Sequence, residues 1–400
     1  MLDAYIYDGL RTPFGRHGGA LAPVRPDDLL AGVIRELVQR NGFEPSRYED
    51  VVIGNTNQAG EDARNVARHA GLLAGLPESV AGITVNRLCG SGLAATLDAA
   101  RMVTVGEGEL IVSGGTESMS RAPFVMAKAE KAFSRDMTIF DSTIGARFPN
   151  PTILSQFGAD TMPETAQNVA DDLGIGREEA DAFAARSQQR YEAARERGFY
   201  REEILPVTVP QGRKKDPLIV ADDEHPRAGT TAEKLAKLPA IVEGGIITAG
   251  NASGVNDGAA ALIIGSRAAG EVAGIAPRAR ILAGAVAGVA PRVMGLGPVE
   301  ACRKALARSG LTLDQMDVIE INEAFATQVL GCCKQLGLAG DDVRLNPNGG
   351  AIAVGHPLGA SGARLALTAM RQLEATGGRY ALVSLCIGIG QGVAMVIEKQ

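Results

Sequence analysis

The sequence predicts an α/β protein made of two similar halves and an inserted segment. Short β-rich runs alternate with helical patterns near both ends of the chain, which is typical of α/β units. The middle of the chain breaks this alternation, because it is richer in charge and contains a long helix candidate over 177–197. We therefore expect a first half over 1–121 that is completed by about 251–277, an inserted domain over 122–250 and a second half over 278–400.

The first predicted elements follow one another from the N-terminus. Residues 1–8 alternate polar and apolar side chains as a strand does, and residues 28–38 carry a helical pattern that stops at Gly42. Short β-rich runs follow at 51–53 and 110–113. Together these segments indicate the first α/β half.

A weak internal repeat connects these segments to the C-terminal part of the chain. The matched segments are 50–55 with 317–322, and 110–115 with 381–386. At the spacing of the first pair, Cys89 corresponds to His356. Chance similarity in a Gly- and Ala-rich chain is the alternative, but reactive side chains at matched positions favour a true repeat.

The composition narrows the class of protein. A chain of 400 residues with 46% hydrophobic content can form two or three packed units. The net charge of −6 argues against a nucleic-acid partner, and no apolar run approaches the ~20 residues of a membrane span. The start resembles no signal peptide, and the odd number of cysteines includes no C-x-x-C pair. We therefore expect a reduced, cytoplasmic protein without a metal site, since the histidines lack ligand spacing.

Cys89 is the first candidate for chemistry. It lies in the segment 86–95, where a predicted strand ends in a glycine-containing turn and an Ala-rich helix begins. A thiol at a helix N-terminus faces free N–H groups and the positive end of the helix dipole, which stabilise a thiolate. Cys89 is thus placed to act as a nucleophile. The alternative is a small buried cysteine at a close-packed junction.

His356 lies in a segment rich in Gly and Pro, over 346–362, before a predicted helix at 360–376. Such a backbone allows close approach and holds the histidine at a turn. His356 can therefore abstract a thiol proton, although a histidine that only caps a turn is the alternative.

Cys386 and Asn322 are two further candidates, each at the end of a predicted strand. Cys386 enters the glycine-rich loop 384–392, whose free N–H groups can bind an oxyanion while the second thiol moves a proton. Asn322 opens the segment 322–325, where its amide can position a water or cap a helix.

These segments together resemble the motif set of the thiolase family over essentially the whole chain. They are Asn86-Arg87-Leu88-Cys89-Gly90-Ser91-Gly92, Asn322-Glu323-Ala324-Phe325, Gly349-Gly350 with Gly355 through Gly362, and Cys386-Ile387-Gly388. The resemblance implies the thiolase fold: two similar βαβαβαββ halves in five layers, with a loop domain that covers the coenzyme A channel. It also implies a homo-oligomer, either dimer or tetramer, for which 121–151 is a plausible contact loop.

The resemblance also assigns roles to the candidate residues. Cys89 becomes the acylated nucleophile, His356 its activator, and Cys386 the acid and base of carbon–carbon bond cleavage or formation. One oxyanion hole would come from His356 with a water held by Asn322, and the other from the backbone N–H groups of Cys89 and Gly388.

Coenzyme A is the substrate that the resemblance implies, and no cofactor is expected to stay bound. The matching positions that would line its site are Arg227, Ser253, Met162 and Phe325. The basic run 213–215 either reaches the phosphates of the coenzyme or is a solvated charge run.

The loop segments 142–151 and 156–166 resemble the subfamily that cleaves 3-oxoadipyl-CoA to succinyl-CoA and acetyl-CoA. A substrate of this kind ends in a carboxylate, and Arg147 is our candidate partner for it, unless Arg147 is simply exposed. Pro163 supports the subfamily, but the capping-box pattern of 161–164 also explains a proline there. The alternatives are a biosynthetic acetyl-CoA acetyltransferase, a decarboxylating condensing enzyme and a non-catalytic acyl-CoA-binding or lipid-binding protein.

Overall fold

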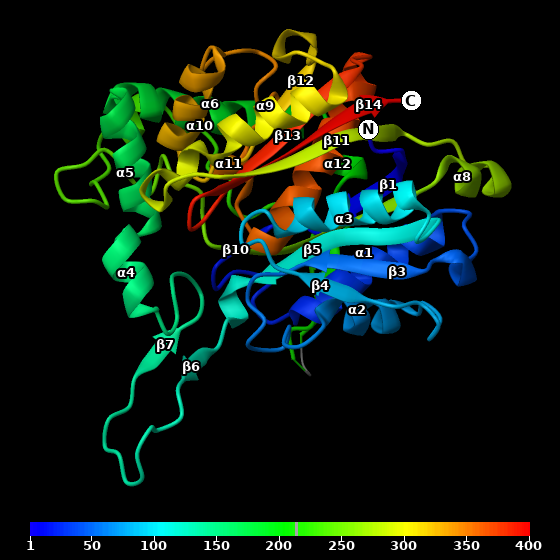
Figure 1. The fold of residues 1–400 in the computed structure, drawn as a ribbon, viewed down its shortest axis with the longest axis horizontal. Coiled ribbons are helices and arrows are strands. Elements are labelled where there is room, and N and C mark those ends of the chain that lie inside the picture. The colour runs from blue at the N-terminus through cyan, green and yellow to red at the C-terminus, as the bar shows by residue number, and fades with distance from the viewer. Residues whose placement is uncertain (213–214) are drawn as a thin grey trace.

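The centre of the protein is a mixed β-sheet, and the computed structural model describes residues 1–212 and 215–400 (Figure 1). The first set of strands is β1 (Ala4–Arg11), β3 (Asp50–Gly54), β4 (Ile83–Val85), β5 (Leu110–Ser118) and β10 (Asn256–Gly265). They lie in the order β4-β3-β5-β10-β1, and the short β2 (Gly15–Arg16) pairs with β10. β3 runs parallel to β4 and β5, whereas β10 runs antiparallel to β5 and β1.

A second set of strands repeats this arrangement. It consists of β11 (Ala279–Gly288), β12 (Val318–Ile321), β13 (Tyr380–Ile387) and β14 (Gln391–Lys399), in the order β12-β13-β14-β11. β12 runs parallel to β13, and Ile319 also pairs in parallel with Leu345, at the place that β4 takes in the first set. The predicted internal repeat is therefore confirmed, and β1 pairs with β11 to join the two sets.

Helices form three layers around the two sets of strands. The outer helices on the first set are α1 (Pro26–Arg40) and α2 (Val66–Ala74). On the second set the outer helix is α9 (Gly297–Ser309), and α10 (Ala326–Leu336) contacts α9. The middle layer consists of α3 (Ser91–Val105) and α12 (Leu358–Thr376), which pack against each other and against strands of both sets (Figure 1). This arrangement confirms the predicted five layers, and α1 and α12 confirm the helices predicted over 28–38 and 360–376.

The two central helices approach most closely at their N-terminal ends, because glycines face each other there. A Cβ atom on Gly92 would lie 2.5 Å from the carbonyl oxygen of Gly359, and one on Gly362 would lie 2.2 Å from the backbone nitrogen of Leu93. Only hydrogen fits into such gaps. The turns that precede α3 and α12, which carry Cys89 and His356, are thereby brought together.

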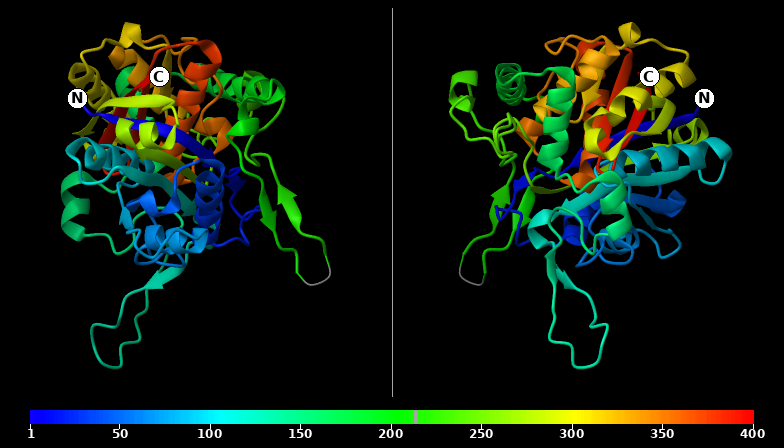
Figure 2. Two further views of the ribbon diagram at one scale, coloured as in Figure 1. Left: turned by 90° about the vertical axis from the view of Figure 1, so that its right-hand side faces the viewer. Right: turned by 60° about the vertical axis from the view of Figure 1, so that its left-hand side comes forward.

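The segment between β5 and β10 forms two hairpins and several helices outside the large sheet. The hairpins, β6 (Phe124–Met126) with β7 (Ile139–Asp141) and β8 (Val207–Val209) with β9 (Leu218–Val220), extend from the body (Figure 2). The helices are α4 (Pro151–Phe157), α5 (Met162–Leu173), α6 (Arg177–Glu196) and α7 (Ala232–Leu235). α6 confirms the helix predicted over 177–197, and α5 and α6 pack on α10. The limits 122 and 250 of an inserted domain stay a prediction.

Two short helices complete the chain, α8 (Arg267–Ala273) after β10 and α11 (Ala351–Val354) just before His356. The predicted capping box at the start of α5 is present: Glu164 accepts hydrogen bonds from the backbone N–H of Thr161 at 2.6 Å and from its hydroxyl at 2.7 Å. Within the described ranges, the structure has no helix with the length and apolar character needed to cross a membrane.

Candidate active site

Cys89 lies in a tight turn between β4 and α3. Leu88, just before it, has a φ of 46°, which is in the left-handed region that a branched side chain rarely adopts. Ser91 stabilises this conformation, because its hydroxyl donates to the carbonyl of Leu88 at 2.6 Å and accepts from the N–H of Arg87 at 2.9 Å. Cys89 is partly exposed, whereas the other four cysteines are buried. The turn thus presents this thiol to ligands.

The electrostatics of Cys89 differ from the expected stabilised thiolate. The backbone N–H groups of Gly388 and of Cys89 itself point at the sulfur and favour the thiolate. The surrounding protein atoms outweigh them, however, because desolvation raises the pKa of Cys89 to about 11, and the buried Glu117 adds to the rise. The thiol is therefore protonated at neutral pH and needs a base. The expectation of a stabilised thiolate was wrong because it considered the N–H groups and dipole at the start of the helix, but not the desolvation of the buried site.

His356 is held so that one ring nitrogen is free to act as that base. Its Nδ1 lies 2.6 Å from the Oγ of Ser361, and this hydroxyl donates to the carbonyl of Pro357 at 2.9 Å. The oxygen of Ser361 must therefore accept from Nδ1–H, which leaves the lone pair on Nε2. The backbone N–H of His356 donates to Oδ1 of Asn256 at 2.9 Å. Burial, with a smaller contribution from Arg364, lowers the pKa of His356 to about 3, so the ring is neutral.

Asn322 faces Nε2 of His356 and can donate to its lone pair. Its Nδ2 lies 3.4 Å from Nε2 of His356, and its backbone N–H donates to the carbonyl of Ser384 at 2.9 Å. The side chain does not cap α10, whose N-cap residue is Phe325, so the capping interpretation of Asn322 is wrong. The buried Oδ1 of Asn322 accepts no hydrogen bond from any of the residues described, and it is a free acceptor for a water.

Cys386 lies at the end of β13, just before the turn that contains Gly388. Its thiol is buried in a small apolar cluster with Ala324 and Phe325. Burial raises the pKa of Cys386 above the ordinary range of a thiol, and negative charge on Cys89 adds to the rise. The two sulfurs are thus close enough to influence each other, and both thiols are protonated in the resting protein.

Three of the predicted coenzyme A contacts lie near these groups. Phe325 shares the apolar cluster of Cys386, the sulfur of Met162 would lie 3.9 Å from a Cβ on Gly388, and the N–H of Ser253 donates to the carbonyl of Ala324 at 2.9 Å. Arg227 is exposed, and its backbone N–H donates to Oε1 of Gln188 at 2.8 Å.

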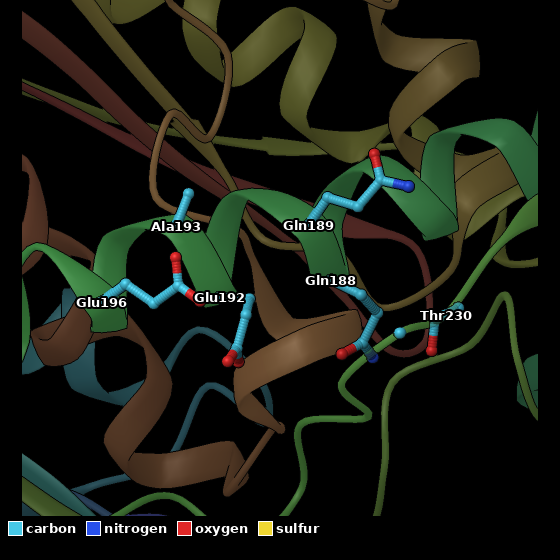
Figure 3. Close-up of a pocket in the computed structure, with 7 residues that line it drawn as sticks. Gln188, Gln189, Glu192, Ala193, Glu196 and Thr230 are labelled. Atoms are coloured by element: carbon cyan, nitrogen blue, oxygen red, sulfur yellow. The ribbon is translucent and has the colours of Figure 1, made fainter.

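A pocket of about 230 Å³ lies along α6 near Arg227 (Figure 3). It is lined by Gln188, Gln189, Glu192, Ala193, Glu196, Gly229 and Thr230. Its carboxylates disfavour phosphate groups. Arg213 and Lys214 lie outside the described residues, and Lys215 is exposed.

Reasoning from the sequence missed two residues that shape the site, Ser361 and Glu117. Ser361 lies in the same Gly-rich segment as His356, so its position close to His356 in the sequence could have indicated this contact. Glu117 is buried at the end of β5 and accepts from the N–H of Gly359 at 2.9 Å, which ties the start of α12 to the first set of strands. Burial raises the pKa of Glu117 to about 7. Nothing in the sequence distinguishes Glu117 from a surface carboxylate.

Comparison with known proteins gives the class to which this fold and this site belong. Residues 4–268 match the family described as "Thiolase, N-terminal domain", and residues 275–399 match "Thiolase, C-terminal domain". The chain belongs to the thiolase family. It is therefore an acyltransferase that acts on coenzyme A thioesters and takes coenzyme A as a substrate.

Individual relatives are similar over the full length of the chain. The beta-ketoadipyl-CoA thiolase of Acinetobacter baylyi is 57% identical over 401 residues, which is 100% of both chains. The 3-oxoadipyl-CoA/3-oxo-5,6-dehydrosuberyl-CoA thiolase of Escherichia coli strain K12 is 58% identical with the same coverage. The crystal structure of human mitochondrial 3-ketoacyl-CoA thiolase in complex with CoA has a TM-score of 0.92 and 39% identity, and it covers 100% of this chain and 98% of that one.

Proposed function

We propose that this enzyme cleaves 3-oxoadipyl-CoA with coenzyme A to succinyl-CoA and acetyl-CoA, through an acyl group on Cys89. The observation that carries the proposal is the identity of 57–58% with thiolases named for this substrate, over 100% of the chain. The same proposal places the enzyme in the β-ketoadipate pathway of aromatic degradation. The free cysteines suit a reducing, cytoplasmic compartment.

The first half of the reaction would begin at Cys89. Nε2 of His356 takes the proton of the Cys89 thiol, and the thiolate attacks the 3-oxo carbon of the substrate. The N–H groups of Cys89 and Gly388, which both point at the sulfur, are placed to stabilise the oxyanion on that carbon. The bond between C2 and C3 then breaks, the acyl group stays on sulfur, and the electron pair leaves with acetyl-CoA as an enolate.

The enolate needs both a stabilised oxygen and a proton. The Nε2–H that His356 has gained, with a water on the free Oδ1 of Asn322, would stabilise the oxygen. Cys386 donates its proton to the enolate carbon, which releases acetyl-CoA. The Cys386 thiolate then takes the proton of the incoming coenzyme A thiol, whose sulfur attacks the acyl group. Cys89 leaves as a thiolate and takes back its proton from Nε2 of His356, which restores the starting state. The raised pKa of Cys386 keeps its thiol protonated until the enolate forms.

Arg147 is the proposed partner of the terminal carboxylate. Its guanidinium is partly buried, and Nη2 donates to Oδ1 of Asn57 at 3.1 Å. The N–H of Asn57 in turn donates to Glu117 at 3.0 Å, and the neighbouring carbonyl of Thr56 accepts from Asn86 at 3.1 Å, in the turn that carries Cys89. This chain of contacts supports Arg147 near the acyl end of the substrate, with further N–H groups for a carboxylate.

Relative rates with two substrates test this proposal. We expect kcat/KM for 3-oxoadipyl-CoA to exceed that for acetoacetyl-CoA by at least about 10-fold, the scale of one charge-assisted hydrogen bond. Equal or reversed preference would instead favour an acetyl-CoA acetyltransferase. That second candidate is supported by a relative of this name from Chromobacterium violaceum, which is 42% identical over 400 residues.

We also propose that the enzyme is a homo-oligomer and that the β6–β7 hairpin, over 124–141, forms a contact between its subunits. The exposed large apolar side chains there are Phe124, Met126, Phe133, Met137 and Ile139. A soluble monomer rarely exposes so many on one arm. Light scattering should give a mass of at least two chains, and Phe133→Asp should lower it. A monomeric parent protein would contradict the proposal.

A further inference from the structure

We propose that a buried contact between Arg364 and Glu320 positions His356 and Asn322 for reaction. Neither residue is expected to touch the substrate, so both are positioning residues. The inference rests on the proposed function, in that it takes His356 and Asn322 to form part of the reacting site.

The two pairs form successive rungs between α12 and β12. In the first rung, Ser361 at the start of α12 holds Nδ1 of His356, and Asn322 at the end of β12 faces Nε2. The second rung lies one turn further along: Nη1 of Arg364 is 3.7 Å from Oε2 of Glu320.

The residue spacing in both elements matches this ladder. Ser361 and Arg364 are three residues apart and lie on one face of the helix. Glu320 lies in β12 and Asn322 directly follows that strand, and the backbone of Asn322 still pairs with Ser384, so residues two apart share one face there. The separation of helix and strand at the second rung therefore sets the separation at the first.

The second rung costs folding free energy, because it buries polar groups that lack hydrogen bonds. This cost argues that the contact has a role beyond stability. The side chains of Arg364 and Glu320 are 1% and 0% exposed. Within residues 1–212 and 215–400, both carboxyl oxygens of Glu320 and two guanidinium nitrogens of Arg364 have no hydrogen-bond partner. Burial raises the pKa of Glu320 to about 8, although the charge of Arg364 opposes the rise. A buried pair with so few hydrogen bonds contributes little to stability, and an apolar pair of similar volume often does better.

Neighbouring charged groups do not replace this contact. Glu323, the nearest other carboxyl on the same segment, already accepts from Ser187 at 2.6 Å, from Asn346 at 2.8 Å and from the N–H of Ile352 at 3.1 Å. It therefore holds the loop before His356 from the other side. Glu320 is therefore the carboxyl that contacts Arg364. The positive charge of Arg364 also helps to keep His356 neutral.

The test is steady-state kinetics of Arg364→Met and Glu320→Gln with 3-oxoacyl-CoA and coenzyme A. We expect each to lower kcat by about 10- to 100-fold, the scale of a misplacement of roughly 1 Å, with the KM for coenzyme A changed less than about 2-fold. Because the two residues act as a unit, the double variant should lose no more than the larger single loss. Arg364→Lys, which keeps the charge, should recover part of the activity. Glu320→Gln nearly keeps the shape of the side chain, so we expect it to fold. It therefore tests the proposal even if Arg364→Met does not fold.

Controls separate positioning from general damage. Asp8→Asn removes the negative charge that accepts from Arg40 at 2.6 Å and from Arg278 at 2.7 Å, near the C-terminal end of α12, and should lower the melting temperature without changing kcat. Folded Arg364 and Glu320 variants with kcat within 2-fold of the parent, or losses that multiply in the double variant, would overturn the inference. His356→Ala in the same assay tests the proposed function itself: if it keeps full turnover, that function fails whatever the other variants do.

Discussion

Nδ1 of His356 lies 2.6 Å from the hydroxyl oxygen of Ser361, which fixes the proton on that side of the ring. The hydroxyl can do so because its own hydrogen is committed to the carbonyl of Pro357, 2.9 Å away. A neutral imidazole has one donor and one acceptor, so the acceptor faces Asn322 and the site. A buried serine thus decides which nitrogen can take a proton.

Ser361→Ala should therefore impair the base. We expect kcat to fall at least about 10-fold, because the other tautomer becomes available, and stability to fall by about 1–3 kcal/mol, because a buried N–H loses its acceptor. Steady-state kinetics and thermal unfolding measure the two effects. Ser309→Ala is the matched control, since the hydroxyl of Ser309 also donates to a helix carbonyl, that of Leu306 at 2.8 Å. Unchanged kcat in Ser361→Ala would show that the ring does not need this contact.

The rate of Cys89 alkylation should keep rising at alkaline pH. Since the folded pKa is raised to about 11, the reactive thiolate is scarce at pH 7 and grows as pH increases toward that value. Iodoacetamide labelling at a series of pH values measures the profile, and Cys89→Ala should lose both this labelling and turnover. A plateau below pH 8 would mean that the thiolate is already stable in the free enzyme.

His356→Ala should slow this labelling at neutral pH, because the proposed acceptor of the Cys89 proton is lost. The pKa of His356 is lowered to about 3, so its ring stays neutral, and able to accept a proton, at every pH above that value. The pH profile of kcat/KM should therefore show no fall near pH 6.5, the ordinary value of a histidine, that is due to His356. Labelling of His356→Ala at the parental rate would show that the turn alone activates Cys89.

Cys386→Ser should separate the two halves of the reaction. Transfer of an acetyl group from acetyl-CoA to Cys89 should persist, while carbon–carbon bond cleavage falls by orders of magnitude, because a serine hydroxyl is a far weaker acid than a thiol. Radiolabelled acetyl-enzyme and single-turnover cleavage are the two measurements. Equal loss of both steps would remove the support for a separate acid and base.

Gly92→Ala should damage both stability and turnover. The new methyl group would lie 2.5 Å from the carbonyl oxygen of Gly359, so α3 and α12 must separate, at a cost of about 1–3 kcal/mol. Gly32→Ala is the control: no atom lies within 4 Å of its Cβ position in α1, and it should stabilise by about 0.5–1 kcal/mol. Thermal unfolding and kcat distinguish the two variants. Normal turnover in Gly92→Ala would mean that the helices tolerate separation.

Arg147→Gln should lower kcat/KM for 3-oxoadipyl-CoA and leave that for acetoacetyl-CoA nearly unchanged. The physical reason is that a terminal carboxylate loses a charged partner, whereas a methyl group has none to lose. An expected loss of about 10-fold corresponds to about 1.4 kcal/mol. Parallel losses with both substrates would place Arg147 in a structural role through Asn57.

The sequence was sufficient to predict the strands and helices that depend on local residue patterns. The matched segments 50–55 and 317–322 became β3 and β12, and the long helix at 177–197 became α6. The pKa of Cys89 was predicted in the wrong direction, because burial depends on how the turn packs against the end of β13, where Ile387 lies 2.7 Å from the Cβ position of Gly90, almost three hundred positions away along the chain. The contact of Arg364 with Glu320 was missed for the same kind of reason, since it exists only where α12 crosses β12.

The repeat has a consequence for how the chain could be divided. Cys89 precedes α3 in one half and His356 precedes α12 in the other, so a fragment that ends after β10 carries the nucleophile without its base. The fragment from β11 onward carries the base without the nucleophile. Each fragment made separately would hold half of the reacting groups, and activity would require both the β1–β11 pairing and the packing of α3 on α12, so turnover would report the joining of the two halves.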